Sequence, residues 1–228
     1  LTTEYNKVIL RSLAEAFEHV SVWAIGPQCI LVGTDRPLSI DVAAFSRRFH
    51  EPAVEAELAR VSLREPETLI AFLSLTEKGL PPLVAGVPLN RDDHPILEFS
   101  AARNLTLPTI GENQAFLAGV REGFAGEFMR ILIPPPDDPD FPERIMRRYT
   151  IVTETLHALA ALNEGDWEGA EPHFERAFAL SPTDPYLRRL FEVSAGRILE
   201  MYRERGDRTM SRRIAKAMKR HLPEGVQN

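Results

Sequence analysis

The sequence lacks the marks of several protein classes. It contains a single cysteine, Cys29, which excludes an internal disulfide framework and suits a reducing cytoplasm. No run approaches the roughly 20 apolar residues of a membrane span, and the stretch from Tyr5 to Phe17 is amphipathic and charged, unlike a signal peptide. No Gly-x-Gly-x-x-Gly loop and no Gly-x-Ser-x-Gly elbow occurs, so this stretch supports neither a dinucleotide loop nor a hydrolase nucleophile. We therefore expect a soluble, cytoplasmic chain.

What the chain does contain is sufficient for a sizeable core. Its 228 residues are 44% hydrophobic with a net charge of -6, which excludes disorder and allows one or two domains. The charge is uneven, because residues 186–221 hold 11 Lys and Arg against 4 Asp and Glu, whereas residues 1–185 hold 16 against 28. A basic helical segment allows a nucleic-acid interpretation. Because no aromatic residues interleave with the Lys and Arg residues of the helix predicted after Gly206-Asp207, we favour a solvated outer face and expect no nucleic-acid partner.

The first 35 residues predict a helix followed by two strands. Tyr5, Ile9, Leu13 and Phe17 recur at helical spacing after a cap at Thr2 or Thr3, and "HVSVWAI" and "CILVG" flank a Gly26-Pro27 turn. The second run is wholly apolar, which is typical of a strand buried on both faces. Such a hairpin needs neighbours, and no comparable set of strands is predicted later in the chain. We therefore expect a C-terminal fragment, starting at Leu1 rather than Met, whose hairpin is the edge of a sheet formed upstream.

The middle of the chain is predicted to be mostly helical. Apolar residues follow a helical period over 41–87, and "PILEF" is the one later strand candidate. A helix is expected to begin at Thr109, where the spacing of a capping box occurs. Its glycines at 119, 123 and 126 suggest close packing against another helix. The proline-rich stretch Ile133 to Glu143 is expected to be a loop.

Residues 151–184 resemble one tetratricopeptide repeat, which consists of two antiparallel helices. The residues expected to pack the two helices or to form the turn and the end of the repeat are Ala158, Gly165, Trp167, Ala170, Phe174, Ala177 and Pro182. Glu154 and His157 replace the large residues usual early in the first helix. Residues 185–222 read as a degenerate repeat and a capping helix, with a second Gly-Asp turn at 206–207. Such arrays bind peptides or serve as structural appendages, and both interpretations stay open.

Residues 1–107 resemble the end of the catalytic domain of bacterial spermidine synthase-like proteins. The resemblance rests on the helix and strand leading to Trp23, the strand closing with Gly33-Thr34, and "LNRDDHPILEF", in which Arg91 and His94 depart from the family's Thr and Arg. It implies a mostly α chain with a small β component: edge strands of a truncated Rossmann-like, methyltransferase-type domain over 1–107, then a tetratricopeptide-like bundle over 108–228. Longer members often carry membrane spans upstream, which would make this the cytoplasmic part of an anchored protein.

The same resemblance implies a function. The family transfers an aminopropyl group from decarboxylated S-adenosylmethionine to putrescine, and its cofactor loop and catalytic aspartate would lie in an upstream catalytic domain. No catalytic residue, cofactor site or metal site is therefore expected in this chain, which should be inactive alone. The alternative is a non-enzymatic helical-repeat module that binds a protein or peptide partner or self-associates as a homo-oligomer.

The acid cluster in "LNRDDHPILEF" has three interpretations. A metal site using Asp92, Asp93, His94 and Glu98 is disfavoured, because neighbouring residues of an extended chain point to opposite faces. Asp92 and Asp93 are the candidates for contacting a diamine in the complete enzyme, since carboxylates suit cationic substrates. The favoured interpretation is structural: the aspartates shape a turn, and His94-Pro95 leads into an extended segment.

Overall fold

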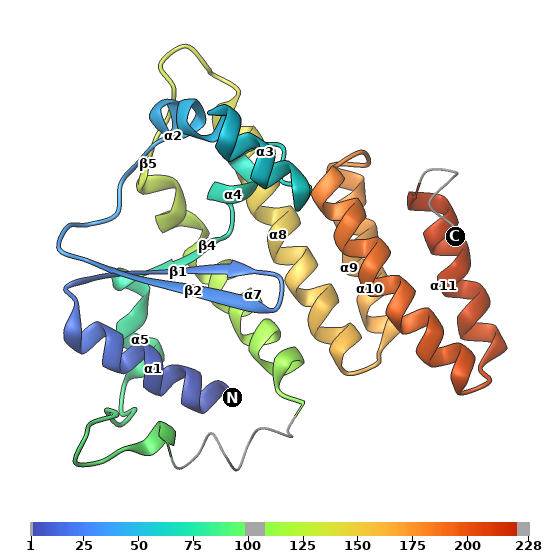
Figure 1. The fold of residues 1–228 in the computed structure, drawn as a ribbon, viewed down its shortest axis with the longest axis horizontal. Helices are drawn as coiled ribbons and strands as arrows, with labels where there is room; N and C mark the ends of the chain where they lie inside the picture. Colours follow the sequence, from blue (N-terminus) through green and yellow to red (C-terminus); the bar gives the residue numbers. More distant parts are fainter. Residues whose placement is uncertain (1, 99–107, 223–228) are drawn as a thin grey trace.

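The computed structural model describes residues 2–98 and 108–222. It is mostly helical with a small sheet, as the sequence predicts (Figure 1). The sheet and the short helices lie at one end of the molecule. The long helices α7 (Ile110–Arg130), α8 (Phe141–Asn163), α9 (Trp167–Leu180), α10 (Pro185–Glu204) and α11 (Arg208–His221) then follow one another toward the other end.

The main sheet has the strand order β2-β1-β4 and is antiparallel throughout. Helix α1 (Thr3–Ala16) leads into β1 (His19–Ile25), which forms a hairpin with β2 (Gln28–Thr34), and β4 (Leu73–Thr76) pairs with the other side of β1. A separate parallel pair joins β3 (Ile40–Asp41) to β5 (Leu132–Ile133). The helix and the hairpin predicted for the first 35 residues are confirmed.

The segment after β3 is less uniformly helical than its period suggests. It contains α2 (Val42–Phe49), α3 (Pro52–Arg60) and α4 (Pro66–Ile70), then β4, the 3-10 turn η1 (Glu77–Gly79) and α5 (Leu80–Val84). Strand β4 was not expected. Its residues Leu73, Ser74, Leu75 and Thr76 do alternate apolar and polar side chains, and all four are buried. The alternation is only four residues long and directly follows apolar residues at helical spacing, so it was not recognised as a strand.

The strand predicted for "PILEF" is wrong where the structure describes it. Ile96, Leu97 and Glu98 are helical, while Phe99 lies outside the described residues. The Asn90 side chain accepts a hydrogen bond from the Leu97 amide at 2.9 Å, and Pro95 stands just before the helical residues. Proline is well suited to the start of a helix because its missing N–H would have no partner there. The apolar run therefore begins a helix.

Helix α7 begins after Thr109, as predicted, but its glycines do not pack as expected. Gly119, Gly123 and Gly126 are exposed, and a Cβ added at any of them would meet nothing within 4 Å among the described residues. The buried face of α7 instead carries Ala118, Arg121, Phe124 and Phe128. The expectation that these glycines mark a helix contact is therefore wrong for this chain as described.

The region predicted as a repeat forms two antiparallel helices. Helix α8 starts at Phe141, ten residues before the predicted start, because Asp140-Phe141-Pro142 supplies a helix beginning directly after the proline loop. The Gly165-Asp166 turn joins α8 to α9, with Gly165 at φ +77° and the Asp166 side chain accepting from the Gly169 amide. Gly206, at φ +73°, and Asp207 repeat this arrangement between α10 and α11. Both turns use glycine where a positive φ would strain other residues.

Helix α8 belongs to two buried clusters. Its first half, with Ile145 and Tyr149, packs with Val20 and Val22 of the sheet and with Phe128 of α7. Its second half packs with α9, α10 and α11. The sheet thus shares one core with α7 and α8, although the sequence resemblance places them in the separate regions 1–107 and 108–228. Within the described residues, no helix is both long enough and apolar enough to cross a bilayer.

Candidate functional site: the open edge of the sheet

The β1–β2 hairpin turns tightly at its tip. Gly26 and Pro27 are the two turn residues, and Ile25 pairs with Gln28. Gly26 has φ +57°, which glycine adopts at no steric cost, and proline suits the second position with its negative φ. The register then runs without a break from Ile25–Gln28 to His19–Thr34. The local sequence therefore determines which residues of β2 face which way.

Strand β2 is an outer strand of the sheet, and within the described chain no strand pairs with its outer edge. Every second residue of β2 points its backbone N–H and C=O groups toward that edge. The Ala24 amide donates to the Phe72 carbonyl at 2.9 Å, so the backbone of Ala24 points toward β4 and away from β2. Cys29, opposite Ala24 in the register, is then a non-hydrogen-bonded partner whose N–H and C=O point outward. By the period of two, Leu31 and Gly33 do the same. These three residues form what we call the open edge.

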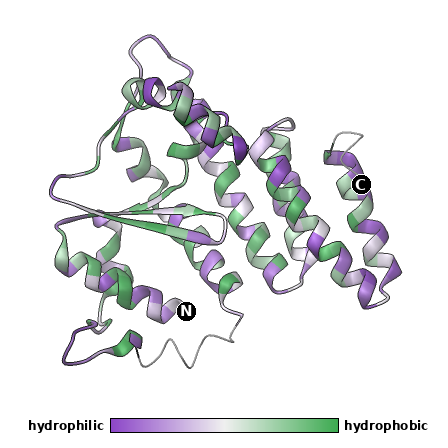
Figure 2. Cartoon of the chain, in the orientation of Figure 1, coloured by the Kyte–Doolittle hydropathy of each residue, from purple (hydrophilic) through white to green (hydrophobic). Residues whose placement is uncertain are grey.

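The two faces of β2 are covered unequally. On one face, Leu31 packs against the core under α1, and Phe17 lies so close to Gly33 that an added Cβ would be 2.3 Å from its ring. On the other face, Ile30 is 51% exposed and Val32 is 38% exposed. The hairpin is hydrophobic over much of its length (Figure 2). A strand with an unpaired edge and an uncovered apolar face is an attachment site for another strand.

The sequence predicted that "CILVG" would be buried on both faces, and this is wrong for the described chain. The run forms a strand, but Cys29, Ile30 and Val32 are exposed. The prediction was based on the apolar composition of the run. Composition indicates that a strand is apolar, but it does not show whether the helices or strands that would cover it are part of this chain.

A pocket of about 380 Å³ lies beside the open edge. Cys29 and Leu31 line it together with Ile9 of α1 and Phe116 of α7, and Asn6 and Gln114 contribute polar groups. Gln114 fixes the hairpin tip by donating to the Gly26 carbonyl. Cys29 is exposed at the strand edge, but desolvation by the surrounding walls raises the pKa of its thiol. The thiol is therefore protonated at neutral pH and a poor nucleophile.

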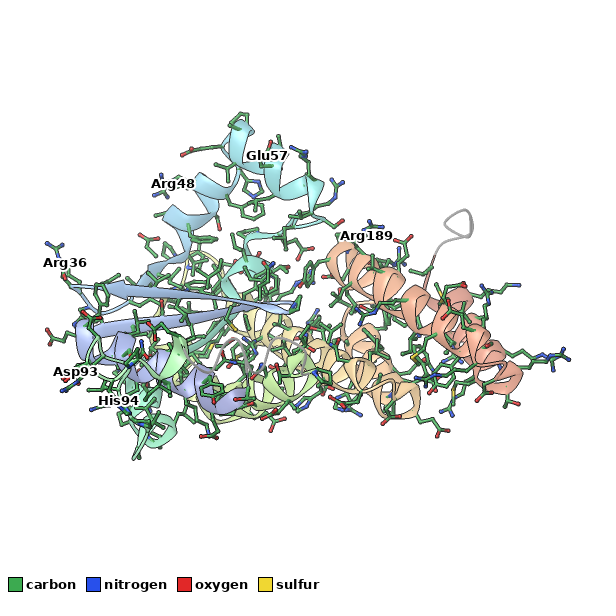
Figure 3. All side chains as sticks on the ribbon, turned by 60° about the horizontal axis from the view of Figure 1, so that its bottom comes forward. Arg36, Arg48, Glu57, Asp93, His94 and Arg189 are labelled. Atoms are coloured by element: carbon green, nitrogen blue, oxygen red, sulfur yellow. The ribbon has the colours of Figure 1, made fainter. Side chains whose placement is uncertain are left out.

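Asp92 and Asp93 lie away from the open edge. They are the central residues of a tight turn in which Arg91 and His94 exchange backbone hydrogen bonds of 2.9 and 3.3 Å. Figure 3 shows Asp93 and His94 at the periphery of the molecule. Both aspartates are exposed, and the turn is held to α1 by the Asn90 amide, which donates to Ser12 Oγ. The turn agrees with the structural interpretation, but the segment after His94-Pro95 is helical and not extended as that interpretation expected. The substrate role of the aspartates stays a prediction.

The repeat residues lie where two helical hairpins meet. The members buried in the shared cluster of α8–α11 are Ala158, Trp167, Ala170, Phe174 and Ala177. Gly165 forms the turn, whereas Pro182 is exposed just beyond α9. Among residues 2–98 and 108–222, no group of three or more His, Cys, Asp or Glu side chains is placed to hold a metal ion.

Sequence reasoning missed Arg121, which joins the sheet to the helices. Its side chain is 0% exposed and donates to the carbonyls of Ala71, Leu73 and Tyr149 and to the hydroxyls of Ser74 and Thr153 at 2.8–3.1 Å. Its guanidinium also lies 4.0 Å from the centre of the Tyr149 ring. Burial lowers the pKa of Arg121 to about 10, so it stays charged at neutral pH. A lone arginine on the apolar face of α7 was the available signal.

The comparisons with known proteins do not identify a family. No family model, no curated protein and no solved structure matches this chain.

Proposed function

We propose that this chain is the C-terminal part of a spermidine synthase-like aminopropyltransferase. In the complete protein, β2 would pair through its open edge with a strand of an upstream catalytic domain, and the Rossmann-like sheet would continue through it. The observation that carries the proposal is β2 itself, whose outward amides have no partner strand and whose apolar face is uncovered in the described chain.

The arrangement of α1 and the hairpin supports this proposal. Helix α1 precedes β1 and packs on one face only, as a helix does when it covers one side of a sheet that continues beyond it. A neighbouring strand would bond to the outward groups of Cys29, Leu31 and Gly33. A helix or loop beside that strand would cover Ile30 and Val32. The exposed edge would then become an interior position.

The chemistry would reside mainly in the upstream domain. It would bind decarboxylated S-adenosylmethionine and deprotonate putrescine, and this chain would supply one wall of the sheet that positions them. Asp92 and Asp93 are the residues proposed here to contact the cationic amine. Their exposure leaves both carboxylates accessible.

The proposal is tested with the longer protein that carries this chain after its upstream sequence. We expect that protein to transfer the aminopropyl group to putrescine and to protect the amides of Cys29, Leu31 and Gly33 from hydrogen exchange. The isolated chain should show no transfer and rapid exchange at these amides. A longer protein with no transferase activity, or with β2 amides as exposed as in the isolated chain, contradicts the proposal.

A proline substitution gives a matched pair of variants. Cys29→Pro removes an N–H that faces the open edge, so the isolated chain should tolerate it while the longer protein loses assembly and activity. Ile30→Pro removes an N–H that faces β1 and should destabilise both forms. If Cys29→Pro leaves the longer protein fully active, β2 does not pair there.

The second candidate is a helical-repeat module that binds a protein or peptide. The two helical hairpins α8–α9 and α10–α11, with their matching Gly-Asp turns, favour it. On the α8 side, however, Glu154 already binds His173 and Arg176, and His157 binds Glu122. Burial by itself would raise the pKa of Glu154. The hydrogen bonds from Arg176 and His173 outweigh burial, so the pKa of Glu154 lies below its usual value. A partner that is captured by the chain and lost on charge reversal of Glu154 and Arg176 would support this candidate.

A further inference from the structure

Helix α11 carries a row of cations that nothing in the described chain neutralises. Its 14 residues include no acidic side chain. Four exposed cations occur at spacings of four, four and three residues: Arg208, Arg212, Lys216 and Lys219. These spacings place them on one face, over about 16 Å of helix. We call this row the basic stripe.

Two other cations of α11, in contrast, form ion pairs with acidic residues of α9. Arg213 binds Glu168 and Glu171 of α9, and Arg220 binds Glu175. The apolar residues Ile214 and Ala217 are buried. One flank of α11 thus pairs with α9, one face packs into the core, and the basic stripe occupies the remaining face with no ion pair in the described residues.

The stripe opposes the stability of its own helix. Arg208 is the first residue of α11, where the helix dipole disfavours a positive charge. Arg208, Arg212 and Lys216 are also like charges at i,i+4 spacing, which destabilise an isolated helix. A purely solvating face could mix charges of both signs, as the other flank does through its partners. The arrangement therefore fits a surface that receives negative charge from outside.

We propose that the basic stripe docks on an anionic lipid surface. Helix α11 lies at the end of the molecule farthest from the sheet, where a flat surface can reach it (Figure 1). No aromatic side chain interleaves with the stripe to stack on bases. The contact is diffuse and electrostatic, the kind that mobile lipid head groups satisfy. The interaction is independent of the aminopropyl-transfer proposal.

Vesicle sedimentation tests the docking surface. We expect the chain to bind vesicles of phosphatidylcholine mixed with phosphatidylserine and not vesicles of phosphatidylcholine alone. Binding should weaken as salt rises, because the Debye length falls from about 10 Å at 0.1 M to about 3 Å at 1 M. The quadruple variant R208Q/R212Q/K216Q/K219Q should lose affinity by about tenfold or more. Circular dichroism should show that this variant keeps its helix content.

A matched control variant removes the same number of positive charges from a part of the chain outside α11. The variant R36Q/R47Q/R48Q/R64Q changes four exposed cations without ion pairs in the described chain, and Figure 3 shows Arg36 and Arg48 far from α11. It should bind the anionic vesicles like the parent chain. Equal loss in both variants would mean a net-charge effect and would overturn the proposal. Failure to bind the mixed vesicles, or stripe-dependent binding to duplex DNA or an acidic protein instead, would overturn it as well.

Discussion

At the scale of single residues, Arg121 shows how one buried charge can organise a fold. From α7 it reaches β4, the residue Ala71 before β4, and α8 at once, and every acceptor it meets is neutral. A guanidinium has five N–H donors in a fixed plane, and five hydrogen bonds are made. The desolvation of its charge is offset by these bonds and by the Tyr149 ring.

Replacing Arg121 should therefore be strongly destabilising. We expect Arg121→Met to lower the free energy of unfolding by about 3 kcal/mol or more, because buried carbonyls and hydroxyls lose their donors. Arg130→Met on the same helix, where the side chain is exposed and, among the described residues, pairs only with Glu127, should change the free energy of unfolding by less than about 0.5 kcal/mol. Urea titration of both variants measures the difference. If Arg121→Met lowered the free energy of unfolding as little as Arg130→Met does, the hydrogen bonds of Arg121 would contribute little to stability.

At the scale of elements, α7 carries glycines without a visible structural need. Each exposed glycine in a helix interior costs about 1 kcal/mol relative to alanine, since it leaves the unfolded backbone more freedom. Gly119, Gly123 and Gly126 have open space around them in the described chain. The same helix holds a different case in Gly111, where an added Cβ would lie 2.9 Å from the Ala160 carbonyl oxygen.

Alanine substitutions should separate the two kinds of glycine. Gly119→Ala, Gly123→Ala and Gly126→Ala should each raise the free energy of unfolding by about 0.5–1 kcal/mol. Gly111→Ala should lower it, because its backbone neighbour cannot move aside cheaply. Thermal unfolding of the four variants provides the comparison. If the first three substitutions destabilise the chain, those glycines contact something other than the described residues.

At the scale of the whole molecule, α8 couples the sheet to the helical hairpins. Its two halves belong to the two largest buried clusters, so neither cluster is complete without it. The two tryptophans report on different parts: Trp23 belongs to β1 of the sheet, and Trp167 is buried among α8, α9 and α10. A helix that serves both cores should make unfolding cooperative.

Single-tryptophan variants test this coupling. In Trp167→Phe the fluorescence comes from Trp23, and in Trp23→Phe it comes from Trp167. Each variant should give a fluorescence transition that coincides with its own transition by circular dichroism. A fluorescence midpoint clearly apart from the circular dichroism midpoint in either variant would show that the sheet and the hairpins unfold separately.

Local chemistry was enough to predict several elements of this chain. Gly26-Pro27 and Gly165-Asp166 determine turns because few residues accept a positive φ, and the period of apolar residues indicates α1 and α9. The tertiary structure decided what local patterns do not encode. The four residues of β4 could be helix or strand until they paired with β1, and "PILEF" began a helix because Asn90 caps it. Burial of Arg121 and exposure of β2 likewise depend on which distant elements lie beside them, because burial is a property of neighbours in space and not in sequence.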